Sequence, residues 1–162
     1  GNLIQSKSNL FSNLKNLKEL EFAHIRNLTS IDSNLFNNLI CLEKFVLKNT
    51  GVELIKDYLF RNSLNLKSII IELHKSLKIE SNAFNGLSNL KCLLLNSNGI
   101  QEINDETFNG LENLIELKLT ESKIKKVDKK SFKYLKSLQI FNVYFNTFQL
   151  INESSNLISN ID

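Results

Sequence analysis

The apolar residues of this chain recur at a spacing of 24 residues, and this spacing restricts its fold more than any other feature. One unit begins at Leu90, and the same apolar pattern begins again at Leu114. Units open at Leu17, Leu42, Leu66, Leu90, Leu114 and Leu138. A repeat of this length predicts a solenoid, in which each unit buries its apolar face by stacking on its neighbours.

A row of phenylalanines supports the same register, although the opening leucines do not define its position. It comprises Phe11, Phe36, Phe60, Phe84, Phe108 and Phe132, spaced by 24 residues except for a first step of 25. We expect these side chains to point inward and to form a continuous stack from repeat to repeat. Replacing one by alanine should cost about 3–5 kcal/mol, the usual penalty for a large core cavity.

The full motif, L-x-x-L-x-L-x-x-N-x-I with a later Phe, resembles the 24-residue leucine-rich repeat of extracellular proteins such as Toll-like ectodomains and insect haemolymph proteins. The resemblance implies an α/β fold: a right-handed, curved solenoid with a parallel sheet on its concave face. Short helical or 3-10 turns and loops would cover the convex face. We expect residues 1–162 to form one array, with a partial repeat at 1–16 and a degenerate end at 152–162.

In this family an asparagine at the ninth position of each repeat bonds to backbone groups and forms a ladder. The residues found there are Ile25, Thr50, His74, Asn98, Ser122 and Asn146. Thr, His and Ser side chains can still satisfy buried backbone groups. Ile25 cannot, and repeat 1 is one residue longer, so we expect its turn to be irregular. Capping residues for the convex turns are predicted at Asp32, Asp57, Ser81, Asp105 and Asp128.

Composition argues against several classes of function. The net charge is only +3 and the basic residues form no phosphate-binding stripe, so we predict no nucleic-acid partner. The densest basic spot, Lys125–Lys126 with Lys129–Lys130, is interpreted as a solvated edge. No apolar run approaches the ~20 residues of a transmembrane helix.

Catalytic and metal-binding patterns are weak. His74 holds a ladder position, and His24, beside Glu19 and Glu21, is a weak candidate for a metal site. The sequence has no glycine-rich phosphate loop and no Cys-x-x-Cys pair. We therefore predict no enzyme activity, no cofactor and no metal.

The two cysteines are predicted to be free thiols. Cys41 and Cys92 lie two repeats apart, which places them at least ~9 Å from one another. That distance exceeds the ~7 Å limit between the Cα atoms of a disulfide. Cys41 is expected to be buried, and Cys92 to face the concave surface.

The concave face is the predicted binding surface, because the residues between the inward leucines point outward. Val46, Ile70 and Leu94 fall in consecutive repeats at the fifth position, with Leu73 alongside, and lysines flank them. A second cluster lies in the last repeat. The candidate partner-binding residues are Lys44, Val46, Lys48, Ile70, Glu72, Leu73, Leu94, Asn96, Lys118, Ile140, Tyr144 and Phe145.

Glycan acceptor triplets begin at Asn27 and Asn152, both outside the concave strands. With the family resemblance, they favour a secreted or receptor-ectodomain protein of innate-immune or cell-surface type that binds a protein partner. Two alternatives remain open. One is a structural protein that associates with itself through uncapped ends, and the other is an intracellular (cytoplasmic) adaptor.

Overall fold

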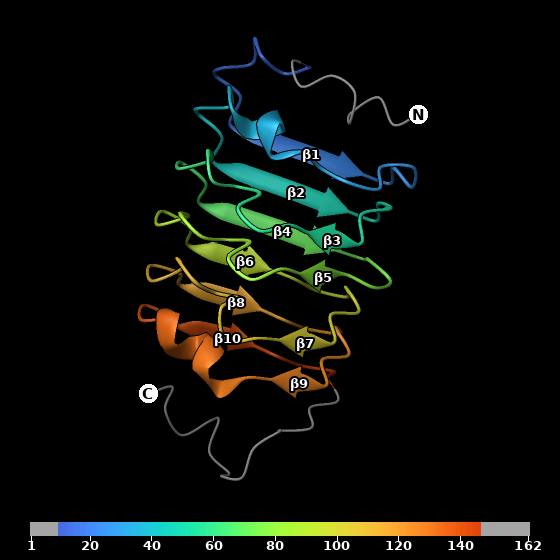
Figure 1. The fold of residues 1–162 in the computed structure, drawn as a ribbon, viewed down its shortest axis with the longest axis vertical. Helices are drawn as coiled ribbons and strands as arrows, with labels where there is room; N and C mark the ends of the chain where they lie inside the picture. The colour runs from blue at the N-terminus through green and yellow to red at the C-terminus, as the bar shows by residue number, and fades with distance from the viewer. Residues whose placement is uncertain (1–9, 147–162) are drawn as a thin grey trace.

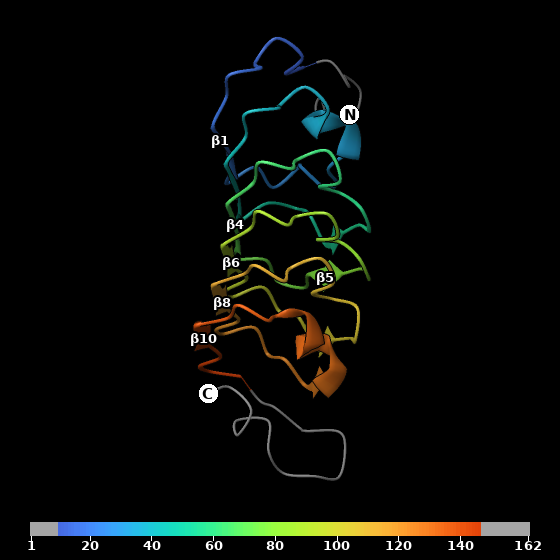
Figure 2. The same cartoon turned by 90° about the vertical axis from the view of Figure 1, so that its left-hand side faces the viewer.

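The computed structural model describes residues 10–146, which form a solenoid of stacked turns (Figures 1 and 2). The expectations for the far N-terminus, for residues 152–162 and for Asn152 therefore lie outside the described residues. One strand from each turn joins a six-stranded parallel sheet. In sheet order these are β1 (Glu19–Ala23), β2 (Lys44–Lys48), β4 (Ser68–Glu72), β6 (Cys92–Leu94), β8 (Glu116–Lys118) and β10 (Ile140–Asn142).

Strand pairing holds equivalent positions of successive repeats side by side. Phe45 of β2 pairs with Ile69 of β4, Ile69 with Leu93, and Leu93 with Leu117. All four side chains are fully buried, because alternation along a strand sends every second residue into the solenoid. The intervening residues lie on the concave face of the sheet, whose strands run along the left side of Figure 2.

The phenylalanine row packs in the interior as two stacks. Phe60 lies between Phe36 and Phe84, with ring centroids 5.2 and 6.2 Å away, and Phe108 lies 6.1 Å from Phe132. Phe11 packs on Phe22 instead, with ring centroids 6.3 Å apart. Within residues 10–146 no ring contact joins Phe11 to Phe36 or Phe84 to Phe108, so the expected continuous stack is interrupted at both places.

Two 3-10 helices, η1 (Ser33–Phe36) and η2 (Lys129–Tyr134), lie on the convex side. The Asp32 and Asp128 carboxylates cap them by accepting the backbone N–H two residues later, at 2.8 Å in each case. These are the only helices in the described part of the chain, and neither could cross a membrane.

The predicted caps of the three middle repeats are wrong. The capping position directly follows the branched residue, where Asp32 and Asp128 stand. In repeat 4 this residue is Asn104, not Asp105, and its side chain accepts the Glu106 N–H at 3.0 Å. Repeats 2 and 3 place Lys56 and Glu80 there, so neither Asp57 nor Ser81 starts a helix, and these segments remain turns.

A second set of short strands forms separate pairs on the outer side. β3 (Leu54–Ile55) pairs with β5 (Lys78–Ile79), and β7 (Glu102–Ile103) pairs with β9 (Lys126–Val127). In residues 10–146 no such ladder joins repeats 1 and 2 or repeats 3 and 4. Junctions with an outer strand pair, called laddered here, therefore alternate along the solenoid with junctions that lack one, called open.

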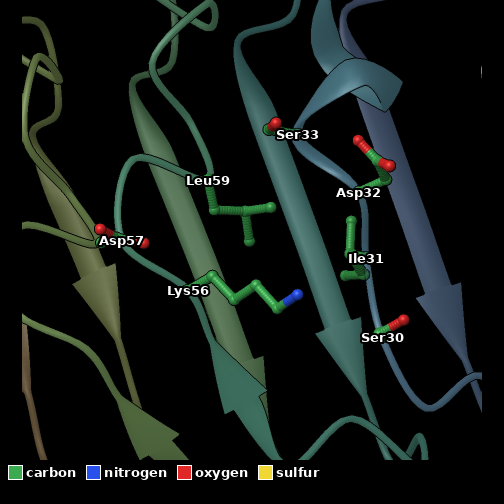
Figure 3. Close-up of a pocket in the computed structure, with 7 residues that line it drawn as sticks. All are labelled: Ser30, Ile31, Asp32, Ser33, Lys56, Asp57 and Leu59. Carbon is green, nitrogen blue, oxygen red and sulfur yellow. The ribbon is translucent and has the colours of Figure 1, made fainter.

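Glycines pack closely at the two open junctions. A Cβ on Gly51 would lie 2.2 Å from the Arg26 carbonyl oxygen, and one on Gly99 would lie 2.2 Å from that of Lys75. Only glycine fits so close to a neighbouring backbone. A hollow of about 440 Å³ also opens at the first junction, where Lys56 extends toward the segment that carries Ile31 (Figure 3).

Candidate functional site: the concave sheet and its polar edge

A buried polar ladder runs beneath the end of the concave strands, as the sequence predicts. Thr50 Oγ1 lies 3.0 Å from His74 Nε2, and His74 Nδ1 lies 3.2 Å from Asn98 Oδ1. Asn98 also donates to the Ile71 carbonyl oxygen at 2.6 Å. Because an amide oxygen can only accept, Nδ1 of the neutral imidazole carries the proton and Nε2 accepts from the Thr50 hydroxyl. Burial, the largest influence on it, lowers the pKa of His74.

The ladder continues into repeats 5 and 6. Ser122 Oγ donates to the Leu95 carbonyl oxygen at 2.8 Å, and the Asn146 amide oxygen accepts the Ser122 N–H at 3.1 Å. Ile25, whose side chain has no polar atom, is half-buried against the core. The ladder therefore starts at Thr50, and its polar groups fix the edge from which the eighth-position residues project.

A second ladder, which was not predicted from the sequence, lies just before the concave strands. The Asn65, Asn89 and Asn113 amides each donate to a backbone carbonyl of the preceding repeat, at 2.6, 2.9 and 2.9 Å. The detectable signal was an Asn-Leu pair recurring every 24 residues at the repeat openings. The concave sheet is thus fastened by side-chain amides at both ends of its strands.

An apolar centre occupies the concave sheet. Val46 pairs with Ile70, and Ile70 with Leu94, so the three side chains occupy one column across adjacent strands. Val46 is only 6% exposed, whereas Ile70 and Leu94 are half-buried. The structure brings these three predicted residues together, although Val46 offers little surface.

The predicted lysines beside this centre are neutralised within the molecule. Lys44 lies 2.6 Å from Glu19, Lys118 lies 2.7 Å from Glu116, and Lys48 lies 3.6 Å from Glu72. Hydrogen bonds to their carboxylate partners raise the pKa of Lys44 and of Lys118. The Asn96 amide completes this border by donating to Glu72 at 3.0 Å.

The eighth residue of every repeat has a positive φ. These residues are His24, Asn49, Leu73, Ser97, Glu121 and Phe145, with φ between 48 and 62°. A left-handed backbone is costly for bulky residues such as Leu and Phe. Leu73 is nevertheless 47% exposed and Phe145 82% exposed, so neither gains a buried site in return. Ile140 (45%) and Tyr144 (67%) of the same repeat are also exposed.

Reactive groups on this face are few. The Cys92 thiol donates to Glu116 at 3.3 Å, and burial, followed by this hydrogen bond, raises its pKa to about 11. Cys41, expected to be buried, is half-buried, and both thiols are free. In residues 10–146 no three His, Cys, Asp or Glu side chains gather in a metal-binding group, and the His24 imidazole instead contacts Asn49 at 3.0 Å.

A solenoid of 24-residue turns, closed by a parallel sheet and an internal polar ladder, defines a class of repeat protein. The sequence model of the leucine-rich repeat matches residues 64–121 and 88–148, which together span more than half of the chain. The chain belongs to the leucine-rich repeat family.

Solved Toll-type structures share this fold. The TLR13–ssRNA13 complex is 28% identical over 86% of this chain, with a TM-score of 0.68. The Drosophila Toll–Spatzle complex is 24% identical over 89% of this chain, with a TM-score of 0.74. The chain spans only 24% and 19% of those two proteins. No curated protein matches the sequence. These findings confirm the predicted solenoid and support a protein-interaction module.

Proposed function

We propose that this chain is a protein-recognition module and that its concave face binds the partner. The observation that carries the proposal is the apolar column of Val46, Ile70 and Leu94 bordered by charges already paired within the molecule. Such a centre loses water at little electrostatic cost, and an apolar core with a polar rim is the usual anatomy of a protein interface. The exposed aromatics Tyr144 and Phe145 supply anchors of the kind that dominate binding energy.

The proposed setting is a secreted protein or a receptor ectodomain, with recognition rather than catalysis as its role. Likeness to TLR13 and Toll, both solved in complexes with partners, supports this setting. Asn27 also supports it, since this glycan acceptor is solvent-exposed together with Thr29. A role in innate immunity is proposed from the Toll likeness alone.

The binding face can be tested with a photo-crosslinking residue in place of Leu94 or Tyr144. The matched control places the same residue at the exposed Ser88, on the loop that precedes β6. After incubation with extracellular fluid from the natural source, we expect a discrete protein adduct at the two concave positions but not at Ser88. Excess wild-type protein should suppress it. Adducts of equal yield at all three positions would refute the concave face, and an adduct with the chain itself would favour self-association.

The proposed extracellular setting, a secreted protein or a receptor ectodomain, needs a separate test. The intact mass of the natural protein should fall after N-glycosidase treatment, by the mass of a glycan on Asn27 or Asn152. An unchanged mass would remove the support that the glycan acceptors give and would favour the intracellular adaptor.

A further inference from the structure

The chain leaves the concave sheet along one edge of the solenoid, on the right side of Figure 1. Basic residues without an ion pair occur in the segments that follow the concave strands there. We name this the basic edge and define it by Arg26, Lys75, Lys78, Lys123 and Lys125. All five residues are exposed, and none forms an ion pair within residues 10–146. The lysines of the concave face are paired, so the basic edge displays cations that remain free to meet an external anion.

The cations of the basic edge follow the alternation of the junctions. Arg26, Lys75 and Lys123 stand in the turns of repeats 1, 3 and 5, and Gly51 and Gly99 take the same place in repeats 2 and 4. Each glycine lies against the carbonyl of the preceding cationic residue. These contacts support the backbone of the cationic turns. Because such turns occur in every second repeat, their side chains lie about 10 Å apart, which is two strand spacings.

Two hollows open in the surface beside these cations. One hollow, of about 280 Å³, is lined by Arg26, Gly51, Lys75 and neighbouring residues. Another, of about 590 Å³, is lined by Lys78, Gly99 and their neighbours. The first hollow therefore lies between two cations of the basic edge, and the second is bordered by one of them, so both offer room for an anionic group beside a cation.

Lys123 supplies a separate indication. Its φ is 56°, close to the 61° of Gly99 at the equivalent place one repeat earlier. Glycine adopts this conformation without strain, whereas lysine does not. The exposed lysine gains no ion pair within residues 10–146 in return. Strain retained without an internal benefit points to a role outside the molecule.

We propose that the basic edge binds an acidic polysaccharide, with sulfate or carboxylate groups seated between the cations. Single-stranded nucleic acid is disfavoured because proteins that hold it stack its bases on aromatic side chains. The edge segments 26–30, 51–54, 75–78, 99–102 and 123–126 contain no aromatic residue. The choice of a polysaccharide rests on the extracellular setting proposed above.

Acidic residues on the same edge provide a further test, because removing a negative charge there should strengthen the binding of a polyanion. Glu102 is neutralised by Lys126 at 2.8 Å, but Glu53, in the first hollow, has no ion pair within residues 10–146. A bound polyanion would be repelled by Glu53. The Glu53→Gln variant should therefore bind more tightly than the wild type.

The experiment measures heparin binding to bacterially produced chain, which carries no glycan, at about 0.1 M salt, where screening extends over about 10 Å. One variant combines Arg26→Gln, Lys75→Gln and Lys78→Gln. The control combines Lys91→Gln, Lys130→Gln and Lys136→Gln, three exposed lysines elsewhere. Both variants have the same net charge. We expect the first to lose about tenfold or more in affinity and the control less than about twofold, because only direct cation–anion contacts release counterions.

Lys123→Gly keeps the test independent of folding, since it relieves backbone strain while removing one cation. Its affinity for heparin should fall about threefold, with no loss of thermal stability. Equal losses in the two triple variants would mean that net charge alone attracts heparin, and the proposal would be overturned. Absence of heparin binding, or tighter binding of a single-stranded RNA of equal charge, would overturn it as well. The mass measurement on Asn27 tests the setting separately, so the two failures can be told apart.

Discussion

The buried ladder can be tested by comparing two asparagines in one turn. Asn98 is completely buried and forms three hydrogen bonds: its amide donates to the Ile71 carbonyl, and its oxygen accepts the His74 N–H and Nδ1–H. Asn96 also forms three, with Glu72 and with the N–H and hydroxyl of Thr120, but it lies on the half-exposed concave face.

Replacing each asparagine by alanine separates the effect of burial from the number of bonds. In Asn98→Ala three buried polar groups lose their partners, and each costs about 1–3 kcal/mol when water cannot replace them. Since partial relaxation reduces the sum, we expect Asn98→Ala to lower the free energy of unfolding by about 3–4 kcal/mol. Asn96→Ala should cost about 1 kcal/mol or less, because water reaches the groups it leaves behind.

Urea unfolding followed by circular dichroism measures both variants. For a slope of about 2 kcal/mol/M, the midpoint of Asn98→Ala should fall by about 1.5–2 M and that of Asn96→Ala by about 0.5 M or less. Equal losses in the two variants would refute the argument, since the number of hydrogen bonds would then matter and their burial would not.

Other consequences concern packing, pH and thiol chemistry. Phe60→Ala should lower the free energy of unfolding by about 3–5 kcal/mol and the half-buried Phe132→Ala by about half as much, as measured by urea unfolding. Because burial lowers the pKa of His74, the unfolded chain binds a proton below pH 6.5 that the folded chain does not, so stability should fall as pH drops through that value. A His74→Asn variant should lose this part of the pH dependence of the urea midpoint, and an unchanged profile would contradict the buried neutral ring. With a pKa of about 11, the Cys92 thiol should react slowly with iodoacetamide at pH 8. Glu116→Gln should accelerate the reaction, because it removes a negative charge that opposes the thiolate. Mass spectrometry of the alkylated peptide measures both rates.

The sequence predicted the elements that depend on a residue's place in the repeat. The concave strands, the inward phenylalanines and the polar ladder all follow from stacking equivalent positions, because a parallel register repeats one environment in every turn. The ladder formed even with His74 and Ser122 in place of asparagine, since each supplies a hydrogen-bonding atom that reaches the neighbouring turn.

Features that depend on the junction between particular repeats could not be predicted in the same way. In repeat 4 the capping residue is Asn104, but Asp105 beside it is also a residue type that caps helices, so residue type alone does not choose between the two. The concave columns were placed correctly, but the burial of Val46 depends on the particular side chains around it. Whether a junction is open or laddered depends on which turn precedes the other, and no single repeat encodes that order.

The alternation of junctions sets a rule for shortening this chain. If repeats 2 and 3 were removed together, Gly99 would meet the carbonyl of Arg26, a contact of the kind that Gly51 already makes. Removing repeats 3 and 4 would bring β3 beside β9, which recreates a laddered junction. Removing repeat 3 alone would place the turn of Gly99 against the turn of Gly51, a junction that occurs nowhere in residues 10–146. Although its sequence repeats every 24 residues, the molecule is modular in units of 48.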